Sequence, residues 1–204
     1  MFIHAPVRRT YDRLAATYDL RWRRYIDASL SFAVESLDVS ASGRVLDVAC
    51  GTGELERRLR SHWPKLRMTG SDLSLNMLRE ASLKDLDAGL VAADVTRLPL
   101  PAGSFDDVFC VNAFHYFRGP HDALAEMHRV LRPAGTLVIV DWCDDYLSCK
   151  LCGAWLRWTD PAFHRMYSVS GCRELLRRAG FTIERVERRR IDFIWGLMRF
   201  ICRR

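Results

Sequence analysis

The chain has 204 residues, 49% of them hydrophobic, which is enough for one domain with its own core. No stretch approaches the roughly 20 uninterrupted apolar residues of a membrane-spanning helix, and residues 1–10 show no secretory signal. Seven cysteines, an odd number, argue against a disulfide framework. We therefore expect a cytoplasmic protein.

The net charge of +6 comes almost wholly from arginine, since only three of the 31 basic residues are lysines. The arginines are spread along the chain, and the densest cluster is at residues 188–190. This distribution favours a solvated basic surface over a nucleic-acid site, so we expect no nucleic-acid partner.

Helical and strand-like patterns alternate along the chain. Residues 1–40 are predicted to form an N-terminal helical cap, because apolar side chains such as Leu14, Tyr18 and Trp22 recur every three to four residues. Strands that alternate with helices predict a parallel, doubly wound sheet. The predicted strands are residues 44–48, 67–71, 89–93, 107–112 and 136–141, and the predicted helices between them begin at residues 54, 75 and 121.

The end of the chain has a different pattern. A helix at 170–179 ends at Gly180, and residues 181–187 and 189–194 are predicted as two strands with a tight connection. So short a link predicts antiparallel pairing, because parallel neighbours need a crossover. The predicted fold is one α/β, Rossmann-like domain over residues 1–204, with five parallel strands, a C-terminal antiparallel hairpin (seven strands in all) and helices on both faces.

A glycine turn follows the first predicted strand. In Val45-Leu46-Asp47-Val48-Ala49-Cys50-Gly51-Thr52-Gly53-Glu54 the strand ends at this turn and a helix begins after it. Backbone N–H groups and the positive end of the helix then lie at the carboxyl edge of the sheet, where glycine lets a ligand approach. Dinucleotide enzymes, nucleotide binders and methyltransferases share this device, and a turn without a ligand also fits it.

Two acidic residues follow the next two strands. Asp72 lies just past the second strand, where a carboxylate can accept both hydroxyls of an adenosine ribose. Asp94 follows the third strand and could accept a hydrogen bond from an adenine amino group. Either could be only a helix cap or turn residue, but three such sites after successive strands predict a binding edge for an adenosyl group.

Together these segments resemble the class I S-adenosylmethionine-dependent methyltransferases, in particular the small-molecule branch that includes the quinone-biosynthesis C-methyltransferases. The glycine turn resembles their first motif, Asp-x-x-x-Gly-x-Gly, although Ala49 and Cys50 stand where the family often has glycine. The resemblance runs from about residue 11 to residue 141. Its other parts are Tyr11 to Asp19, Gly70 to Ser74 with Met77-Leu78, Asp94-Val95, Leu98 to Asp106, and Val130 to Leu137.

The resemblance implies S-adenosyl-L-methionine as the cofactor. The glycines and Asp47 would attend its methionyl part, Asp72 its ribose, and Asp94 with Val95 its adenine. Leu73 and Met77 would cover the ring, Asn112 would line the methionyl side and Tyr18 would close over the cofactor. The complete implied set is Tyr18, Asp47, Ala49, Gly51, Gly53, Asp72, Leu73, Met77, Asp94, Val95 and Asn112.

His115 and Tyr116 are the candidate catalytic residues. Methyl transfer to a sulfonium-activated carbon needs mainly the alignment of the nucleophile, and a base only if the nucleophile must lose a proton. Both residues come just after the fourth strand. His115 could instead be a packing residue beside the cofactor.

Residues 142–168 are rich in tryptophan, tyrosine and leucine and are predicted to form a substrate lid with a lipophilic pocket. The same residues could also form ordinary core. Cys149 and Cys152 stand three apart without a second pair, so no metal site is predicted. Residues 193–204 mix apolar and basic side chains, and they could contact a membrane or, as we prefer, pair at a sheet edge.

The predicted function is methyl transfer from S-adenosyl-L-methionine to a small, lipophilic acceptor, such as a quinone, phenol, lipid or amine. A non-catalytic sensor or assembly protein that binds the same cofactor is an alternative. A nicotinamide-dependent oxidoreductase is a weaker one, because Glu56 stands where its fingerprint needs a third glycine. The acceptor atom and the oligomeric state have no signature in the sequence.

Overall fold

A seven-stranded sheet forms the centre of the molecule. The structure is a computed structural model that describes residues 5–35, 37 and 42–204. The strand order is β3-β2-β1-β4-β5-β7-β6, in which β7 runs antiparallel to both of its neighbours and the other pairs on the β3 side are parallel. The predicted fold is confirmed. The strands are β1 (Arg44–Val48), β2 (Arg67–Asp72), β3 (Ala88–Ala92), β4 (Phe105–Val111), β5 (Leu131–Trp142), β6 (Thr182–Arg190) and β7 (Gly196–Arg203).

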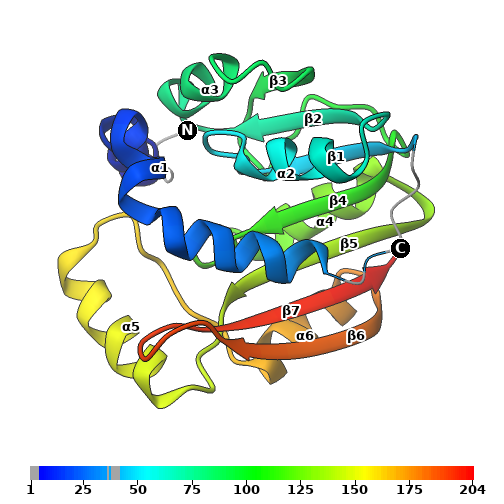
Figure 1. The fold of residues 1–204 in the computed structure, drawn as a ribbon. Coiled ribbons are helices and arrows are strands. Elements are labelled where there is room, and N and C mark those ends of the chain that lie inside the picture. The colour runs from blue at the N-terminus through cyan, green and yellow to red at the C-terminus, as the bar shows by residue number, and fades with distance from the viewer. Residues whose placement is uncertain (1–4, 36, 38–41) are drawn as a thin grey trace.

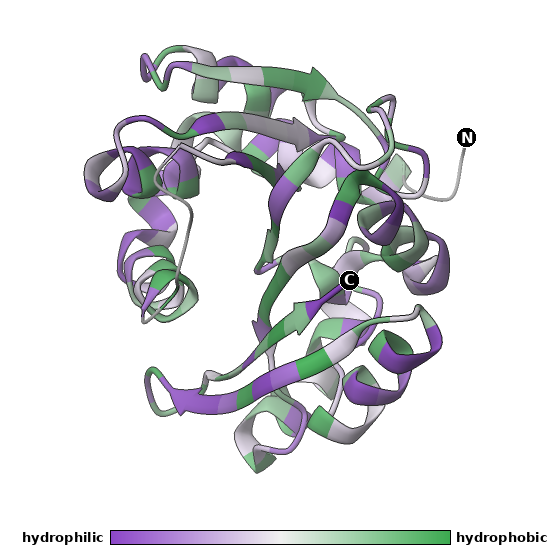
Figure 2. Cartoon of the chain, turned by 90° about the vertical axis from the view of Figure 1, so that its right-hand side faces the viewer, coloured by the Kyte–Doolittle hydropathy of each residue, from purple (hydrophilic) through white to green (hydrophobic). Residues whose placement is uncertain are grey.

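Helices cover both faces of this sheet, as the two views in Figures 1 and 2 show. The long first helix lies across the sheet in front of β4 and β5 (Figure 1). The helices are α1 (Ala5–Val34), α2 (Glu54–His62), α3 (Leu75–Ser82), α4 (Pro120–Val130), α5 (Leu147–Thr159) and α6 (Val169–Arg178), with a single 3-10 turn, η1, at Phe114–Tyr116.

The alternation of side chains along the strands divides the core into two clusters. On β4, Val108 and Cys110 belong to the cluster that contains residues of α4 and α6. Phe109, between them, belongs to the cluster that contains residues of α1 and α2. All three are fully buried. A strand with apolar residues on both faces is what a doubly wound sheet requires.

The predicted N-terminal helical segment contains one continuous helix. It runs without interruption from Ala5 to Val34. Residues 1–4, 36 and 38–40 of the expected cap, which ended at residue 40, lie outside the described residues.

The second strand of the C-terminal hairpin was predicted at the wrong place. Residues 189–194 were expected to form it, but β6 continues to Arg190 and the returning strand begins only at Gly196. The connection is shaped by Asp192, whose carboxylate accepts hydrogen bonds from the backbone N–H groups of Ile194 and Trp195. The apolar pair Phe193-Ile194 resembled a strand but forms the exposed tip of this loop.

The rest of the C-terminal segment is an interior strand. β7 lies between β5 and β6, and its residues 196–202 are buried. Pairing within the sheet therefore accounts for most of residues 193–204, which leaves only the loop tip exposed for any contact with a membrane.

Arg199 on β7 joins the end of α1 to the sheet. Its guanidinium donates to the carbonyls of Phe32 (2.5 Å) and Glu35 (2.7 Å) and forms an ion pair with Glu187. It also lies over the Phe32 ring, 4.8 Å from the centroid. A buried charge with this many partners holds the C-terminal end of α1 against the strand.

Replacing Arg199 with methionine should lower the free energy of unfolding by about 2–3 kcal/mol, because buried carbonyls lose their donors. Urea denaturation followed by circular dichroism measures the change. The matched control is Arg178→Met, which removes an exposed pair with Glu174 and should cost less than about 0.5 kcal/mol. Equal effects of the two substitutions would show that Arg199 does not anchor α1.

Candidate functional site

The loop after β1, at the carboxyl edge of the sheet, contains three residues with left-handed backbone conformation. Ala49, Gly51 and Gly53 have φ of 59°, 56° and 78°. The N–H of Cys50 donates to the carbonyl of Ser71 at 3.0 Å, which ties the loop to the end of β2. At Ala49 this value is one that glycine adopts freely, whereas alanine takes it only with some strain.

Asp72 connects this loop to the loop after β2. One carboxylate oxygen accepts from the N–H of Gly51 at 2.9 Å and the other from the N–H of Ser74 at 2.8 Å. Burial raises the pKa of Asp72, and these backbone hydrogen bonds oppose the rise. Each oxygen keeps a second lone pair for a ligand.

A cavity opens above these loops. Among its lining residues are ten of the eleven predicted cofactor residues. Gly53 is the exception: a Cβ at this position would lie 2.2 Å from Cδ1 of Leu86, so Gly53 faces away from the cavity and serves the close packing of the turn. The ten lining residues are Tyr18, Asp47, Ala49, Gly51, Asp72, Leu73, Met77, Asp94, Val95 and Asn112.

A pair of buried carboxyl groups lies under this cavity. Asp47, on β1, is 4% exposed and Glu56, on α2, is 1% exposed. Burial raises the pKa of Asp47 well above its ordinary range and that of Glu56 to about 7, and the negative charge of Glu56 raises that of Asp47 further. The low polarity around both carboxyls therefore favours their protonated forms.

Asn112 stands where β4 ends, with φ of 58°. Its side-chain oxygen accepts from the hydroxyl of Tyr25 at 2.8 Å, and its amide nitrogen donates to Ser29 Oγ at 2.7 Å. Its backbone N–H donates to Val140 at 2.8 Å. Asparagine tolerates this left-handed conformation, and these bonds fix it between the sheet edge and α1.

Three tyrosines of α1 face the same region. Tyr11, Tyr18 and Tyr25 are spaced seven residues apart and therefore share one face of the helix. The rings of Tyr11 and Tyr18 meet edge to face at 5.9 Å. Burial raises the pKa of each, so all three stay neutral hydrogen-bonding groups at physiological pH.

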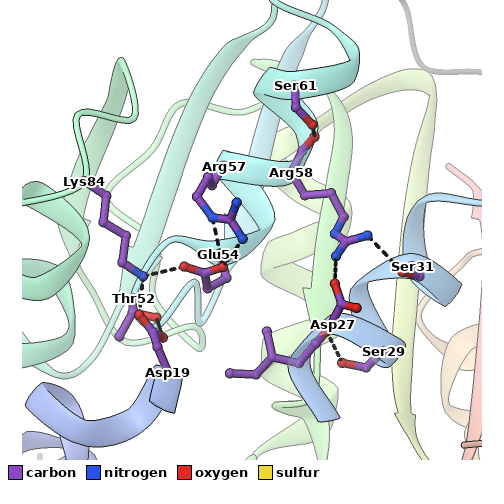
Figure 3. A network of polar contacts seen from close by, with 11 residues as sticks. Asp19, Asp27, Ser29, Ser31, Thr52, Glu54, Arg57, Arg58, Ser61 and Lys84 are labelled. Carbon is purple, nitrogen blue, oxygen red and sulfur yellow. Dashed lines mark hydrogen bonds and ion pairs between the residues drawn. The ribbon is translucent and has the colours of Figure 1, made fainter. Parts of the chain in front are cut away.

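Ion pairs hold α1 over the cavity, as Figure 3 shows. Lys84 Nζ lies 2.5 Å from Asp19 of α1 and 2.7 Å from Glu54 of α2. Asp19 also accepts from the hydroxyl of Thr52 at 2.5 Å, which lies in the glycine turn. Farther along α1, Asp27 pairs with Arg58 of α2. The helix is thus fastened to the loop that shapes the cavity.

A second cavity, of about 530 Å³, adjoins the first, and this volume is typical of small-molecule sites. Its walls come from α1, α5 and the segment after β4. Four residues line both cavities, so the two spaces meet there: Tyr11, Tyr18, Asn112 and Tyr116.

His115 lines the second cavity and is paired with an acid that the sequence analysis did not identify. Its Nδ1 lies 2.6 Å from Asp141 Oδ1, and its backbone N–H donates to Asp141 Oδ2 at 2.8 Å. Since an ionised carboxylate only accepts, Nδ1 carries the proton and Nε2 has a free lone pair. Among the described residues Nε2 has no hydrogen-bond partner, although it is buried.

Aromatic rings fix the orientation of this histidine. The imidazole stacks on Trp142 with centroids 3.8 Å apart, and Trp142 stacks on Trp195 at 4.4 Å. The ring of Tyr116 also lies close to the imidazole of His115, with centroids 3.9 Å apart. Burial and the nearby acids raise the pKa of Tyr116, which favours its neutral form.

Several site residues were missed in the sequence. The seven-residue spacing of Tyr11 and Tyr25 with Tyr18 was a usable signal. Asp141 ends the fifth predicted strand, and parallel strands bring their ends to one edge, so its approach to His115 could also have been inferred. Trp195 had no signal, because most of the loop that carries it was predicted as part of a strand.

The predicted lid contains α5. Cys149 is buried on it and donates from Sγ to the carbonyl of Ile194 at 3.4 Å, whereas Cys152 lines the second cavity. No group of metal-binding side chains is found among the described residues.

Comparison with known proteins bears on this geometry. Residues 46–139 match a sequence family described as "Methyltransferase domain". A demethylmenaquinone methyltransferase of Thermus thermophilus is 37% identical over 128 residues, covering 61% of this chain and 55% of that protein. A malonyl-[acyl-carrier protein] O-methyltransferase of Laribacter hongkongensis is 36% identical over 154 residues, covering 69% of this chain and 52% of that protein. The chain thus spans about half the length of these curated relatives.

The fold agrees with these matches. A solved 1,6-didemethyltoxoflavin-N1-methyltransferase of Burkholderia thailandensis superposes with a TM-score of 0.76 at 20% identity, covering 98% of this chain and 88% of that one. That methyltransferase was solved with bound 1,6-didemethyltoxoflavin and S-adenosylhomocysteine.

Sequence and fold are thus both similar to those of methyltransferases, in agreement with the expected resemblance to the class I family. Within this family the glycine turn after β1 and the acid after β2 are the parts that the sequence resemblance had assigned to the cofactor. The buried carboxyl of Glu56 was not among them, and it places a titratable group beneath the glycine turn.

Glu56→Gln should change how stability depends on pH. The folded pKa of about 7 lies above the ordinary value of about 4.3, so the folded state favours the protonated acid, and this contribution is lost as pH rises through 7. From pH 5 to pH 8 the variant should therefore gain about 1–3 kcal/mol of stability relative to wild type. Urea denaturation at both pH values measures it.

The control for this titration is Glu174→Gln, which changes an exposed glutamate of α6 and should leave the pH dependence as it is. Parallel curves for wild type and Glu56→Gln would mean that Glu56 ionises in the folded state as it does in water.

Proposed function

We propose that this class I methyltransferase transfers a methyl group from S-adenosyl-L-methionine to a small, lipophilic acceptor that loses a proton. The observation that carries the proposal is the junction of the two cavities. The first cavity has loop carboxylates and backbone N–H groups suited to an adenosyl amino acid, and the second has an oriented histidine with a free nitrogen.

The residues of the first cavity fit the cofactor. Asp72, already held by two backbone N–H groups, would accept the ribose hydroxyls with its remaining lone pairs, and Asp94 with Val95 would meet the adenine. The Asp47–Glu56 carboxyl pair would attend the ammonium of the methionyl part. The N-terminal end of α2 and its preceding turn favour the carboxylate of that part.

S-adenosyl-L-methionine supplies a methyl group on a positively charged sulfur. The protein has to hold the acceptor on the axis of that bond and exclude water, and such positioning can contribute several kcal/mol (roughly 7–11 at most). Tyr11, Tyr18 and Tyr116 line both cavities and form the aromatic walls of the junction. Aromatic faces also favour a positively charged group through their quadrupoles.

His115 is the proposed base. Asp141 fixes the tautomer in which Nδ1 donates, so Nε2 can take a proton from an acceptor in the second cavity. Asp141 also stabilises the imidazolium that results, in the manner of other carboxylate–histidine pairs. An oxygen, nitrogen or carbon acid would be activated in this way, and a nucleophile that needs no deprotonation would gain nothing from it.

The walls of the second cavity suggest a lipophilic acceptor. Four tryptophan and four tyrosine side chains are among its lining residues, with polar groups that could orient a substrate. The names of the two curated relatives refer to different acceptors, a demethylmenaquinone and a malonyl group on a carrier protein. The proposal therefore rests on the pocket: a planar, largely apolar molecule with one ionisable group.

We further propose that the reaction takes place in the cytoplasm. All seven cysteines are free thiols, and six are buried. Free thiols persist in a reducing compartment.

Asp72→Asn should weaken binding of S-adenosylhomocysteine at least tenfold, because hydrogen bonds to a charged group contribute about 1.5–3 kcal/mol. Isothermal calorimetry with the purified chain measures this directly. Asp87→Asn, which changes an exposed carboxylate beside Arg60, is the control and should keep wild-type affinity. An unchanged affinity in Asp72→Asn would remove Asp72 from the ribose site.

His115→Gln and Asp141→Asn should each lower kcat at least about 100-fold, since general-base catalysis contributes roughly 10²–10⁴. Affinity for S-adenosylhomocysteine should stay within about twofold, because His115 does not line the first cavity. Production of S-adenosylhomocysteine from a panel of phenols, quinols and amines identifies an acceptor for the assay.

The exposed His121, changed to glutamine, is the control and should keep the wild-type rate. Wild-type turnover in His115→Gln would end the base assignment. Tight cofactor binding without turnover of any acceptor would instead favour a non-catalytic sensor.

A further inference from the structure

A stripe of large apolar side chains on α5 faces away from the protein. Leu147, Leu151, Trp155 and Trp158 are 71%, 66%, 62% and 91% exposed. Their spacing of four, four and three residues puts them on one side of the helix, together with the exposed Ala154. We call these five residues the α5 stripe. A contiguous apolar surface of this kind usually marks an interaction site.

The opposite side of α5 fixes the helix to the protein. Cys149 is fully buried and donates from Sγ to Ile194 in the loop between β6 and β7. Gly153 packs closely against Met166, since a Cβ there would lie 3.4 Å from the sulfur. With its inner side held in this way, the stripe is a fixed outer surface.

The loop beside α5 enlarges the apolar surface. Figure 1 shows the turn between β6 and β7 next to α5 at the edge of the molecule. At its tip, Phe193 is 94% exposed and Ile194 is 51% exposed.

Basic side chains flank the stripe along α5. Residues 147–159 contain no acidic side chain, and the exposed Lys150 and Arg157 lie on one flank of the stripe, seven residues apart. At the start of the helix, Arg188 and Arg190 lie over the ring of Tyr146, at 5.8 Å and 5.1 Å from its centroid.

Four acidic residues, Asp144, Asp145, Asp160 and Asp192, lie near the ends of this surface. Three of them make local contacts. Asp145 accepts from the N–H of Val169 and lies 3.8 Å from Arg188. Asp160 accepts from the N–H of Ala162 at 2.8 Å, and Asp192 accepts from the N–H groups of its own loop. Along α5 itself, the flank of the stripe carries only basic side chains, Lys150 and Arg157.

The stripe also adjoins the second cavity. Trp155 belongs to both, because it is exposed on the stripe and lines the cavity, and Leu156 and Thr159 line the cavity from the same helix. The second cavity is thus directly beside the stripe, so an apolar molecule bound at the stripe would lie next to the cavity.

We propose that the α5 stripe and the loop at residues 191–195 seat the protein on the surface of an anionic lipid bilayer. Tryptophan and leucine are suited to the boundary between headgroups and acyl chains, and the basic flank is attracted to anionic headgroups. Lys150 and Arg157 can extend toward the headgroups while their stems stay on the apolar surface. A lipophilic molecule could then enter the second cavity from the bilayer.

Flotation of the full chain with phosphatidylcholine vesicles, with and without phosphatidylglycerol, tests this proposal. Wild type should float with the anionic vesicles, and Leu151→Ser combined with Trp158→Ser should lower partitioning about tenfold or more, because two interfacial side chains are lost. Neither residue lines a cavity, and both are exposed, so the variant should fold. Lys150→Glu with Arg157→Glu should remove the preference for phosphatidylglycerol.

The matched control is Leu83→Ser, which changes an equally exposed leucine (75%) after α3 and should float like wild type. Wild type that stays free of anionic vesicles, or a double serine variant that floats as well as wild type, would overturn the proposal. So would a dimer in light scattering that the double serine variant abolishes, since a second copy would then cover the stripe. The assay needs neither cofactor nor acceptor, so its result is independent of the proposed methyl transfer.

Discussion

The position of α1 across the carboxyl edge of the sheet is the constraint on which the site depends. A doubly wound sheet leaves that edge open, and the loops after β1, β2 and β4 would face solvent without a cover. Two sets of contacts hold α1 there: Lys84 pairs with Asp19 in the middle of the helix, near the glycine turn, and Arg199 binds the carbonyls at the C-terminal end. The helix contributes a wall to both cavities, and its residues Tyr11 and Tyr18 line the place where the cavities meet.

This arrangement explains the unusual backbone at the ends of β1 and β4. Ala49 and Asn112 have positive φ without being glycine, and both lie at strand ends that line the first cavity. Asn112 is held to α1 through Tyr25 and Ser29. Two of the five described non-glycine residues with positive φ thus lie where the sheet edge, the covering helix and the cavities come together.

Prediction from the sequence succeeded where the signal was local. Strand and helix alternation gave the sheet, and the placement of Asp72 just after a strand put it at the correct edge, since parallel strands end together. The prediction failed at the C-terminal hairpin, because Asp192 makes a loop of residues whose side chains favour a strand. The pairing of Asp141 with His115 joins residues 26 apart, and it follows only once β4 and β5 are neighbours.

The central claim is that both cavities serve one reaction centre at their junction. The most direct measurement is a crystal structure of the chain with S-adenosylhomocysteine. The account predicts that the ribose hydroxyls lie on Asp72 and that the sulfur lies at the junction lined by Tyr18, Asn112 and Tyr116, open to the cavity of His115. A sulfur directed away from that cavity, or a ligand bound elsewhere, would contradict it.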